Sequence, residues 1–280
     1  MTDRAPSCDL SSWQERSFTF TDGRHTHCCY EKGDGPRGVI LLPEIPGITP
    51  EVLGLGQHLV SEGFRVVIPS LFGKPGKPDS RARSVVALAR VCVSAEFRAF
   101  ATNADRPVAA FVRALAADLA SRTGAPGVGV IGLCFTGGFA LAAAVDDSVS
   151  AAVLSQPSVP LPVTAARRAD AGASEGELAC VQERAGDDGP CLMGLRFSED
   201  RKSPQERFAT LSAVFGPAFR VISLSSAPGN SGGFRPGAHS VLTREVRETP
   251  GHPALDARAE VVAFLKERLP VPGSPSSAES

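Results

Sequence analysis

The sequence lacks an excess of charge of either sign. Its 280 residues hold 29 lysines and arginines against 30 aspartates and glutamates, for a formal net charge of −1. Nucleic acids and anionic membrane surfaces attract proteins through clustered basic residues, so we expect neither as a partner. Long apolar runs are also missing, since a stretch such as 139–145 is far shorter than the roughly 18 residues that a membrane span needs. With a polar N-terminus as well, these absences predict a cytoplasmic protein that keeps its whole chain.

Signatures of common cofactor and metal sites are missing too. The sequence has no C-x-x-C pair and no phosphate-loop GK[ST] motif. Residues 127–132 spell G-x-G-x-x-G, but these glycines lie along a predicted strand rather than at the start of a helix, so we expect no dinucleotide. His25, His27, Cys28 and Cys29 are crowded on one predicted edge strand and cannot all face one ion. We therefore expect no cofactor and no metal.

Seven cysteines form no regular framework, which is typical of free thiols in a reducing compartment. At this length a large hydrophobic core can form without disulfides. We expect one domain over residues 1–269, with 1–15 as an N-terminal extension. Residues 270–280 have nothing to bury and predict a disordered tail.

Apolar runs rich in β-formers alternate with helical patterns. Because the runs are continuous rather than alternating, they predict parallel strands covered on both faces by helices, an α/β fold. The predicted strands are 38–42, 65–69, 128–133, 150–155, 191–197 and 219–224. The predicted helices are 50 to about 62, about 107 to 122, 204–215 with a capping box from Ser203 to Glu206, and about 255 to 268. Ligand chemistry in such sheets lies in the loops at the carboxyl ends of the strands.

One of these loops carries a candidate nucleophile. Strand 128–133 runs directly into Cys134, which small residues flank at Gly132, Thr136 and Gly137. This strand, sharp turn and helix is the pattern of a nucleophile elbow, although the stricter pattern has glycine in place of Thr136. The backbone N–H groups of the helix that follows would stabilise a thiolate. The alternative is that Cys134 is a small buried hydrophobic residue, but its position favours a nucleophile.

A cysteine hydrolase also needs an imidazole and a carboxylate that orients it. His239 follows the last predicted strand in a long loop, where the base of such a fold belongs, while His252 lies beside a proline at the start of the final helix and is more typical of a cap. Asp200 and Glu199 both follow strand 191–197, and residue chemistry alone does not choose between them. The order cysteine, acid, histidine is that of the α/β-hydrolase fold.

A further carboxylate, Glu44, directly follows strand 38–42 between two prolines. In this fold the loop after that strand supplies one oxyanion-hole N–H, and the residue after the nucleophile supplies the other, which predicts Ile45 and Phe135. A carboxylate near a thiol at a strand end is a candidate functional group. The alternative is a glutamate at the entry to a helix or at the surface.

Together these segments resemble the dienelactone hydrolases, α/β-hydrolases with a cysteine nucleophile and a mostly parallel central sheet covered by helices. The resemblance spans about 36 to 268 and rests on PEIPGITPEV, EGFRVVIPSLFGKPG, GLCFTGG, Asp200 with SPQERF, and AHSVLT. It implies a triad of Cys134, Asp200 and His239. It also implies that Glu44 is the carboxylate that, in the family, is associated with the resting cysteine and helps to form the thiolate. The sequence departs from the family at Thr136, in the long loop before His239, and at 92–100, where no substrate-binding arginine can be matched.

The resemblance and the residues predict a hydrolase of carboxylic esters or lactones, similar to carboxymethylenebutenolidase, which forms a thioester acyl-enzyme. We expect a small-molecule substrate with an activated leaving group, and a monomer or homodimer. Two other hypotheses use the same pocket: a non-catalytic protein that binds a small acid or signals a redox state, and a peroxide-sensing thiol at Cys134.

Overall fold

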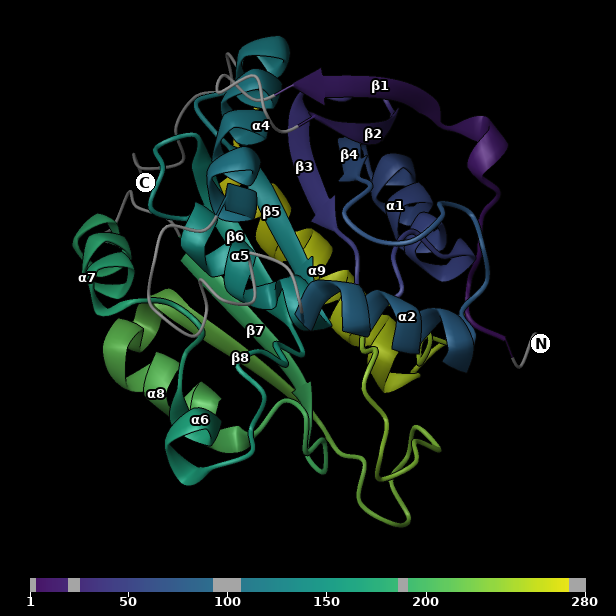
Figure 1. Cartoon of the computed structure of the whole chain (residues 1–280), viewed down its shortest axis with the longest axis vertical. Coiled ribbons are helices and arrows are strands. Elements are labelled where there is room, and N and C mark those ends of the chain that lie inside the picture. The colour runs from purple at the N-terminus through teal and green to yellow at the C-terminus, as the bar shows by residue number, and fades with distance from the viewer. Residues whose placement is uncertain (1–3, 20–25, 93–106, 186–190, 272–280) are drawn as a thin grey trace.

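The computed structural model describes residues 4–19, 26–92, 107–185 and 191–271. An eight-stranded sheet runs through the molecule in the order β1-β2-β4-β3-β5-β6-β7-β8 (Figure 1). The strands are β1 Gln14–Thr19, β2 Thr26–Lys32, β3 Arg37–Leu42, β4 Phe64–Pro69, β5 Val128–Leu133, β6 Val149–Ser155, β7 Cys191–Phe197 and β8 Phe219–Leu224.

The six strands from β3 to β8 pair in parallel, and each lies within one residue of its predicted bounds. The α/β prediction is therefore confirmed. The prediction that the segment around Cys28 is an edge strand is wrong, because β2 lies between β1 and β4 and pairs antiparallel with both. The edge strand is β1, whose alternating, half-exposed side chains leave no continuous apolar run to detect.

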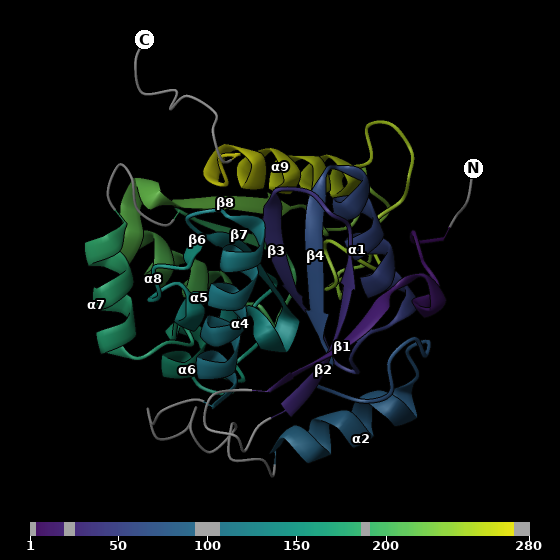
Figure 2. The ribbon, with the colours of Figure 1, turned by 90° about the horizontal axis from the view of Figure 1, so that it is seen from above.

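Helices cover both faces of the sheet (Figure 2). The core on one face is formed with α1 Pro50–Ser61 and α9 Pro253–Arg268, and the core on the other with α4 Pro107–Thr123, α5 Gly137–Ala143, α7 Glu175–Arg184 and α8 Gln205–Phe215. Two further α-helices are α2 Arg81–Cys92 and α6 Ala165–Ala169. Within the described ranges, no helix has both the length and the apolar character needed to cross a bilayer.

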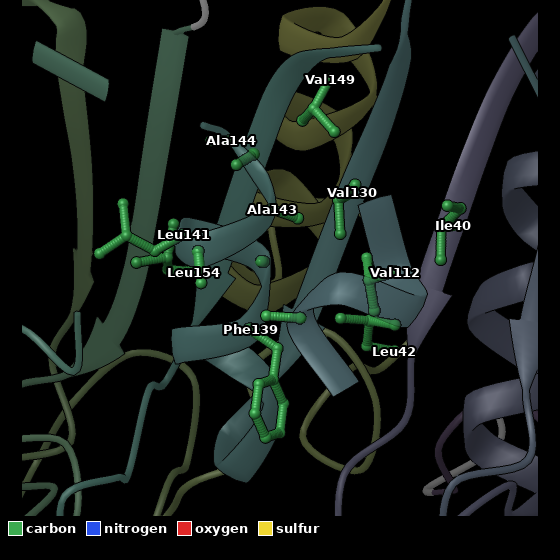
Figure 3. Close-up of a cluster of buried hydrophobic side chains, with 14 of the residues drawn as sticks. Ile40, Leu42, Val112, Val130, Phe139, Leu141, Ala143, Ala144, Val149 and Leu154 are labelled. Carbon is green, nitrogen blue, oxygen red and sulfur yellow. The ribbon is translucent and has the colours of Figure 1, made fainter. Parts of the chain in front are cut away.

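The core beneath the candidate nucleophile is built from small and branched side chains (Figure 3). All seven residues of α5 are buried, and the helix packs on β5 and β6. This close packing holds the start of α5 rigidly at the carboxyl end of β5. The side chains of this core cluster include Ile40, Leu42, Val112, Val130, Phe139, Leu141 and Leu154.

Residues at the N-terminus of the described chain lie along α1. A Cβ added at Gly56 would lie 2.6 Å from the ring of Trp13, and one added at Gly54 would lie 2.5 Å from the carbonyl oxygen of Pro6. Both glycines therefore let this segment approach the helix closely. The predicted disordered tail falls almost wholly in 272–280, outside the described residues.

The helix starts differ in one place from their sequence signals. In α1, Thr49 accepts a hydrogen bond from the Val52 N–H over 3.4 Å, as expected of a cap beside Pro50. The capping box predicted at Ser203 is wrong, because α8 begins after Pro204 and the Ser203 hydroxyl has no hydrogen-bond partner within the described ranges. The Ser203 carbonyl instead accepts from Nε of buried Arg196, seven residues earlier, over 3.1 Å.

Candidate active site

Cys134 stands at a sharp turn between β5 and α5. Its φ angle is +54°, a left-handed conformation that is costly for a residue with a side chain and is typical of a strained functional turn. The turn needs Gly132, since a Cβ there would lie 2.4 Å from the carbonyl oxygen of Thr136. The Cys134 side chain is half-buried and opens on a pocket.

Thr136, the departure from the stricter elbow pattern, has a structural role in this turn. Its hydroxyl accepts from the Leu133 N–H over 2.9 Å and contacts the carbonyl oxygen of Leu42 over 3.1 Å. The side chain is fully buried between β5 and β3. The threonine therefore ties the elbow to the neighbouring strand, a link that glycine could not make.

Asp200 and His239 form a buried pair beside this turn. His239 Nδ1 lies 2.6 Å from Asp200 Oδ2, and the second carboxylate oxygen accepts from the Lys202 N–H over 3.0 Å. Glu199 is exposed. His252 lies at the first cap position of α9 without a capping hydrogen bond from its side chain, and its ring packs against Phe234. Of the alternatives left open by the sequence, Asp200 and His239 are the two that the structure brings together.

The surroundings of His239 favour the imidazolium. Burial alone would lower the pKa of His239, but negative charge on the Cys134 sulfur and the hydrogen bond to Asp200 outweigh it and raise the pKa to about 10. Nε2 is buried and makes no hydrogen bond to the residues that the structure describes. The imidazolium is therefore the favoured form of the His239 ring at neutral pH.

Cys134 has a polar neighbour that the sequence analysis missed. Its Sγ lies 3.1 Å from the Ser158 hydroxyl, and the Ser158 N–H donates to the Cys134 carbonyl over 3.1 Å. The available signal was the polar sequence SQPS at the carboxyl end of β6, the parallel strand next to β5. Its conformation, which brings Ser158 to the sulfur, could not be derived from spacing.

Glu44 is only 2% exposed, so the alternative of a surface glutamate is wrong. Its two carboxylate oxygens accept hydrogen bonds from Ser240 over 2.7 Å and from Thr243 over 2.6 Å. Arg244 Nη2 lies 3.7 Å from Glu44 Oε2, and Arg244 also forms an ion pair with Asp79. The sequence analysis singled out neither Arg244 nor Asp79. Glu44 thus connects the loop after β3 to the segment that follows His239.

These groups surround one pocket of about 530 Å³, a size suited to a small molecule. Cys134, His239 and Glu44 line it together with Ile45 and Phe135, the residues expected to supply the oxyanion hole. The lining of this pocket also includes apolar side chains and basic side chains. The apolar side chains are Val85, Val159, Leu161 and Pro162, and the basic ones are Arg201, Lys202 and Arg244. Of the segment 92–100, in which no substrate-binding arginine could be matched, only Cys92 at the end of α2 is described, and 93–100 lie outside the described residues.

The cysteine and histidine segment near the N-terminus has another role. The His27 ring packs edge-on against Phe111, with 4.5 Å between ring centroids. Cys29 is buried, and burial raises the pKa of its thiol to about 12, so this thiol is unreactive. In the part of the chain that the structure describes, no three His, Cys, Asp or Glu side chains are grouped to hold a metal ion.

Comparison with solved structures shows the same fold in several hydrolases. A dienelactone hydrolase-like promiscuous phosphotriesterase from metagenomic libraries is 15% identical with a TM-score of 0.58, covering 92% of this chain and 100% of that one. A putative dienelactone hydrolase from Klebsiella pneumoniae subsp. pneumoniae is 17% identical with a TM-score of 0.59, covering 90% and 98%. A cold-adapted esterase from an Arctic intertidal metagenomic library is 16% identical with a TM-score of 0.55, covering 92% and 95%.

No curated protein matches the sequence. The model of the dienelactone hydrolase family matches residues 29–173, just over half of the chain. This match covers β3, the loop with Glu44 and the elbow with Cys134, and it confirms the resemblance seen in the sequence motifs. The chain belongs to the dienelactone hydrolase family and is a hydrolase of the ester type with the α/β-hydrolase fold.

Proposed function

We propose that the protein hydrolyses carboxylic esters or lactones through a thioester acyl-enzyme on Cys134. The observation that carries the proposal is the buried pair of His239 Nδ1 and Asp200 Oδ2, 2.6 Å apart, in a histidine that lines the same pocket as Cys134. A nucleophile, a base and a group that orients the base are the three parts of a hydrolytic triad. Structurally similar proteins named as an esterase and a dienelactone hydrolase-like enzyme support this class of reaction.

In the first half of the reaction, the Cys134 thiolate attacks the carbonyl carbon and forms a C–S bond. The carbonyl π electrons move to oxygen, and the N–H groups of Ile45 and Phe135 stabilise the resulting oxyanion. As the oxyanion collapses, the bond to the leaving oxygen breaks, and the imidazolium of His239 gives that oxygen its proton. An alcohol or enol leaves, or the ring of a lactone opens, and the acyl group remains on sulfur as a thioester.

In the second half, neutral His239 takes a proton from water while the water oxygen attacks the thioester. The C–S bond breaks with its electron pair on sulfur, which restores the thiolate and imidazolium pair and frees the carboxylic acid. Asp200 keeps the ring in the required tautomer and stabilises its positive charge. Glu44 is positioned to hold the loop of Ile45 against the segment of His239, and its bonds to Ser240 and Thr243 support this role.

The pocket lining supports a substrate class. Its apolar part suits a small hydrocarbon acyl or alkyl group, and its basic side chains suit a negatively charged end, as in lactones of the carboxymethylenebutenolide type. A thiolate is a better leaving group than a plain alkoxide, so attack on alkyl esters and amides should mostly reverse. We therefore propose activated esters and enol lactones as substrates. The cytoplasmic location and the monomeric or homodimeric state of the protein stay predictions.

The test is turnover of p-nitrophenyl acetate and small enol lactones by the wild type, Cys134→Ala and the control Cys180→Ala. Cys180 is a half-buried thiol on α7 whose sulfur lies 3.9 Å from the Val145 carbonyl oxygen and does not line the pocket of Cys134, so its loss should leave turnover unchanged. We expect Cys134→Ala to lose turnover and intact-mass measurement to find an acetyl group on the wild type at Cys134. Equal inactivity of the wild type and Cys134→Ala on all substrates would refute the proposal. Sulfenic acid at Cys134 after peroxide, without ester cleavage, would instead favour the redox hypothesis.

A further inference from the structure

We propose that Ser158 is a further catalytic residue, whose hydroxyl donates a hydrogen bond to the Cys134 sulfur when it leaves as a thiolate during hydrolysis of the acyl-enzyme. The inference rests on the proposed function and goes beyond the triad. Ser158 Oγ lies 3.1 Å from Cys134 Sγ, and the serine is 6% exposed at the edge of the pocket. When the sulfur is ionised it has no proton, so the hydroxyl must be the donor.

The backbone around Ser158 holds this contact in place. The Ser158 N–H donates to the Cys134 carbonyl over 3.1 Å, which fixes the two residues side by side. The preceding residue, Pro157, packs on the first turn of α5, where a Cβ added at Gly137 would lie 2.7 Å from the proline Cβ. Gln156 has a φ angle of +40° and its N–H donates to the Leu195 carbonyl over 2.7 Å. A strained conformation at the end of β6 thus directs the chain toward the elbow.

A buried arginine from α8 anchors the same segment. Arg207 is fully buried and donates to main-chain carbonyls at Pro157 over 2.7 Å, Pro160 over 2.6 Å, Arg167 over 3.1 Å and Asp170 over 2.6 Å. Burial lowers the pKa of Arg207 to about 10, so the charge is kept there at a cost that these carbonyls offset. Arg207 is a positioning residue, because it acts on the sulfur only through the segment that carries Ser158.

The hydroxyl affects the two halves of the reaction differently. In acylation the sulfur begins with negative charge and loses it, so a hydrogen bond to the thiolate stabilises the starting state and does not favour attack. In deacylation the C–S bond breaks and the electron pair passes to sulfur, so the same hydrogen bond strengthens as the thiolate leaves. The interaction therefore lowers the barrier to deacylation selectively.

This asymmetry gives a kinetic signature. The ratio kcat/KM reports the steps through acylation, whereas kcat reports deacylation when the acyl-enzyme accumulates. Ser158→Ala should therefore lower kcat, lower KM by at least the same factor, and leave kcat/KM equal to that of the wild type or higher. A hydrogen bond to a charged group is worth enough to lower kcat about tenfold.

The experiment compares stopped-flow hydrolysis of p-nitrophenyl acetate and phenyl acetate by the wild type, Ser158→Ala, Ser158→Thr and Ser148→Ala. We expect Ser158→Ala to show a burst, to accumulate an acetyl-enzyme in quenched intact-mass measurements, and to reach the same kcat with both esters because they share that intermediate. Ser158→Thr, which keeps the hydroxyl, should restore most of kcat. Ser148 lies at the other end of β6 with its hydroxyl on Asp146, so Ser148→Ala should behave as the wild type.

A fall of kcat/KM as large as that of kcat in Ser158→Ala, with no accumulated acetyl-enzyme, would overturn the role of Ser158 while leaving the proposed function standing. A wild type that forms no acetyl-enzyme and turns over neither ester nor lactone would overturn the proposed function itself. The two failures are therefore distinguishable in one set of measurements.

Discussion

Glu44→Gln changes one oxygen of a buried carboxylate to an NH₂ group and keeps the side-chain volume. In the wild type, Ser240 donates to one carboxylate oxygen over 2.7 Å and Thr243 to the other over 2.6 Å. The amide can accept from only one of these hydroxyls, so the other loses its acceptor inside the protein. Glu44 is 2% exposed, so water cannot readily replace that acceptor.

The size of the effect follows from these two bonds. A hydrogen bond to a charged group contributes about 2 kcal/mol and one between neutral groups about 1 kcal/mol. Losing one charged bond and weakening the other should lower the free energy of unfolding by about 3 kcal/mol. The contact with Arg244 at 3.7 Å adds little, because the arginine side chain is 40% exposed. At roughly 2–4 °C per kcal/mol, the midpoint of thermal unfolding should fall by about 6–12 °C.

The assay is thermal and urea unfolding at pH 7, followed by kcat/KM and its pH profile at a temperature where both proteins are folded. We expect kcat/KM to fall as well, because Ser240 and Thr243 follow His239 directly in the chain. Glu199→Gln is the matched control, since that carboxylate is exposed and its loss should change stability by less than about 0.5 kcal/mol. Unchanged stability in Glu44→Gln would refute the reasoning. Lower stability with an unchanged pH profile and kcat/KM would show that the carboxylate is structural only.

Two further predictions concern the triad and the elbow. Asp200→Asn should lower kcat by about 10³- to 10⁴-fold. The same change should affect the pH dependence of stability, because the pKa of His239 is raised from 6.5 to about 10. The stabilisation of the folded state by protonation of His239 is fully present below about pH 6.5 and is lost as pH rises through about 10. Urea unfolding from pH 6 to 10.5 should therefore show a stability gap between wild type and Asp200→Asn that narrows as pH rises from about 6.5 to about 10, and a constant gap would contradict this. Gly132→Ala should cost about 3 kcal/mol in the same assay, because its Cβ would lie 2.4 Å from the Thr136 carbonyl oxygen. The control Gly176→Ala meets no atom within 4 Å in α7 and should be neutral or stabilising by up to about 1 kcal/mol, so equal effects of the two changes would refute the steric argument.

The parallel part of the sheet was readable from the sequence because buried parallel strands are apolar on both faces. A continuous apolar run such as 128–133 that is flanked by glycines and helix signals fits few structures other than a buried strand. The antiparallel edge was not readable in this way. β1 Gln14–Thr19 is half-exposed, and it is a strand because β2 provides its hydrogen-bond partners. Pairing between segments, rather than composition, makes it a strand.

The candidate site likewise has one part that the sequence predicts and another part that only the structure shows. The elbow at Cys134 is a local structure, since a strand, a turn of small residues and a helix follow one another within about ten residues. Asp200 could not be separated from Glu199 by residue type, because both follow the same strand and are one residue apart. Only the fold shows that Asp200 is buried against His239 while Glu199 is exposed.

By itself, then, the sequence determined the α/β fold, the elbow and the family, because each depends on contiguous patterns of burial, turn geometry and motif order. The tertiary structure decided which polar groups meet. It placed the Ser158 hydroxyl on the Cys134 sulfur, and it placed Glu44 between two hydroxyls from the segment after His239. These contacts join residues 24, 196 and 199 positions apart, and their distances depend on how the strand ends are packed together, which no local pattern encodes.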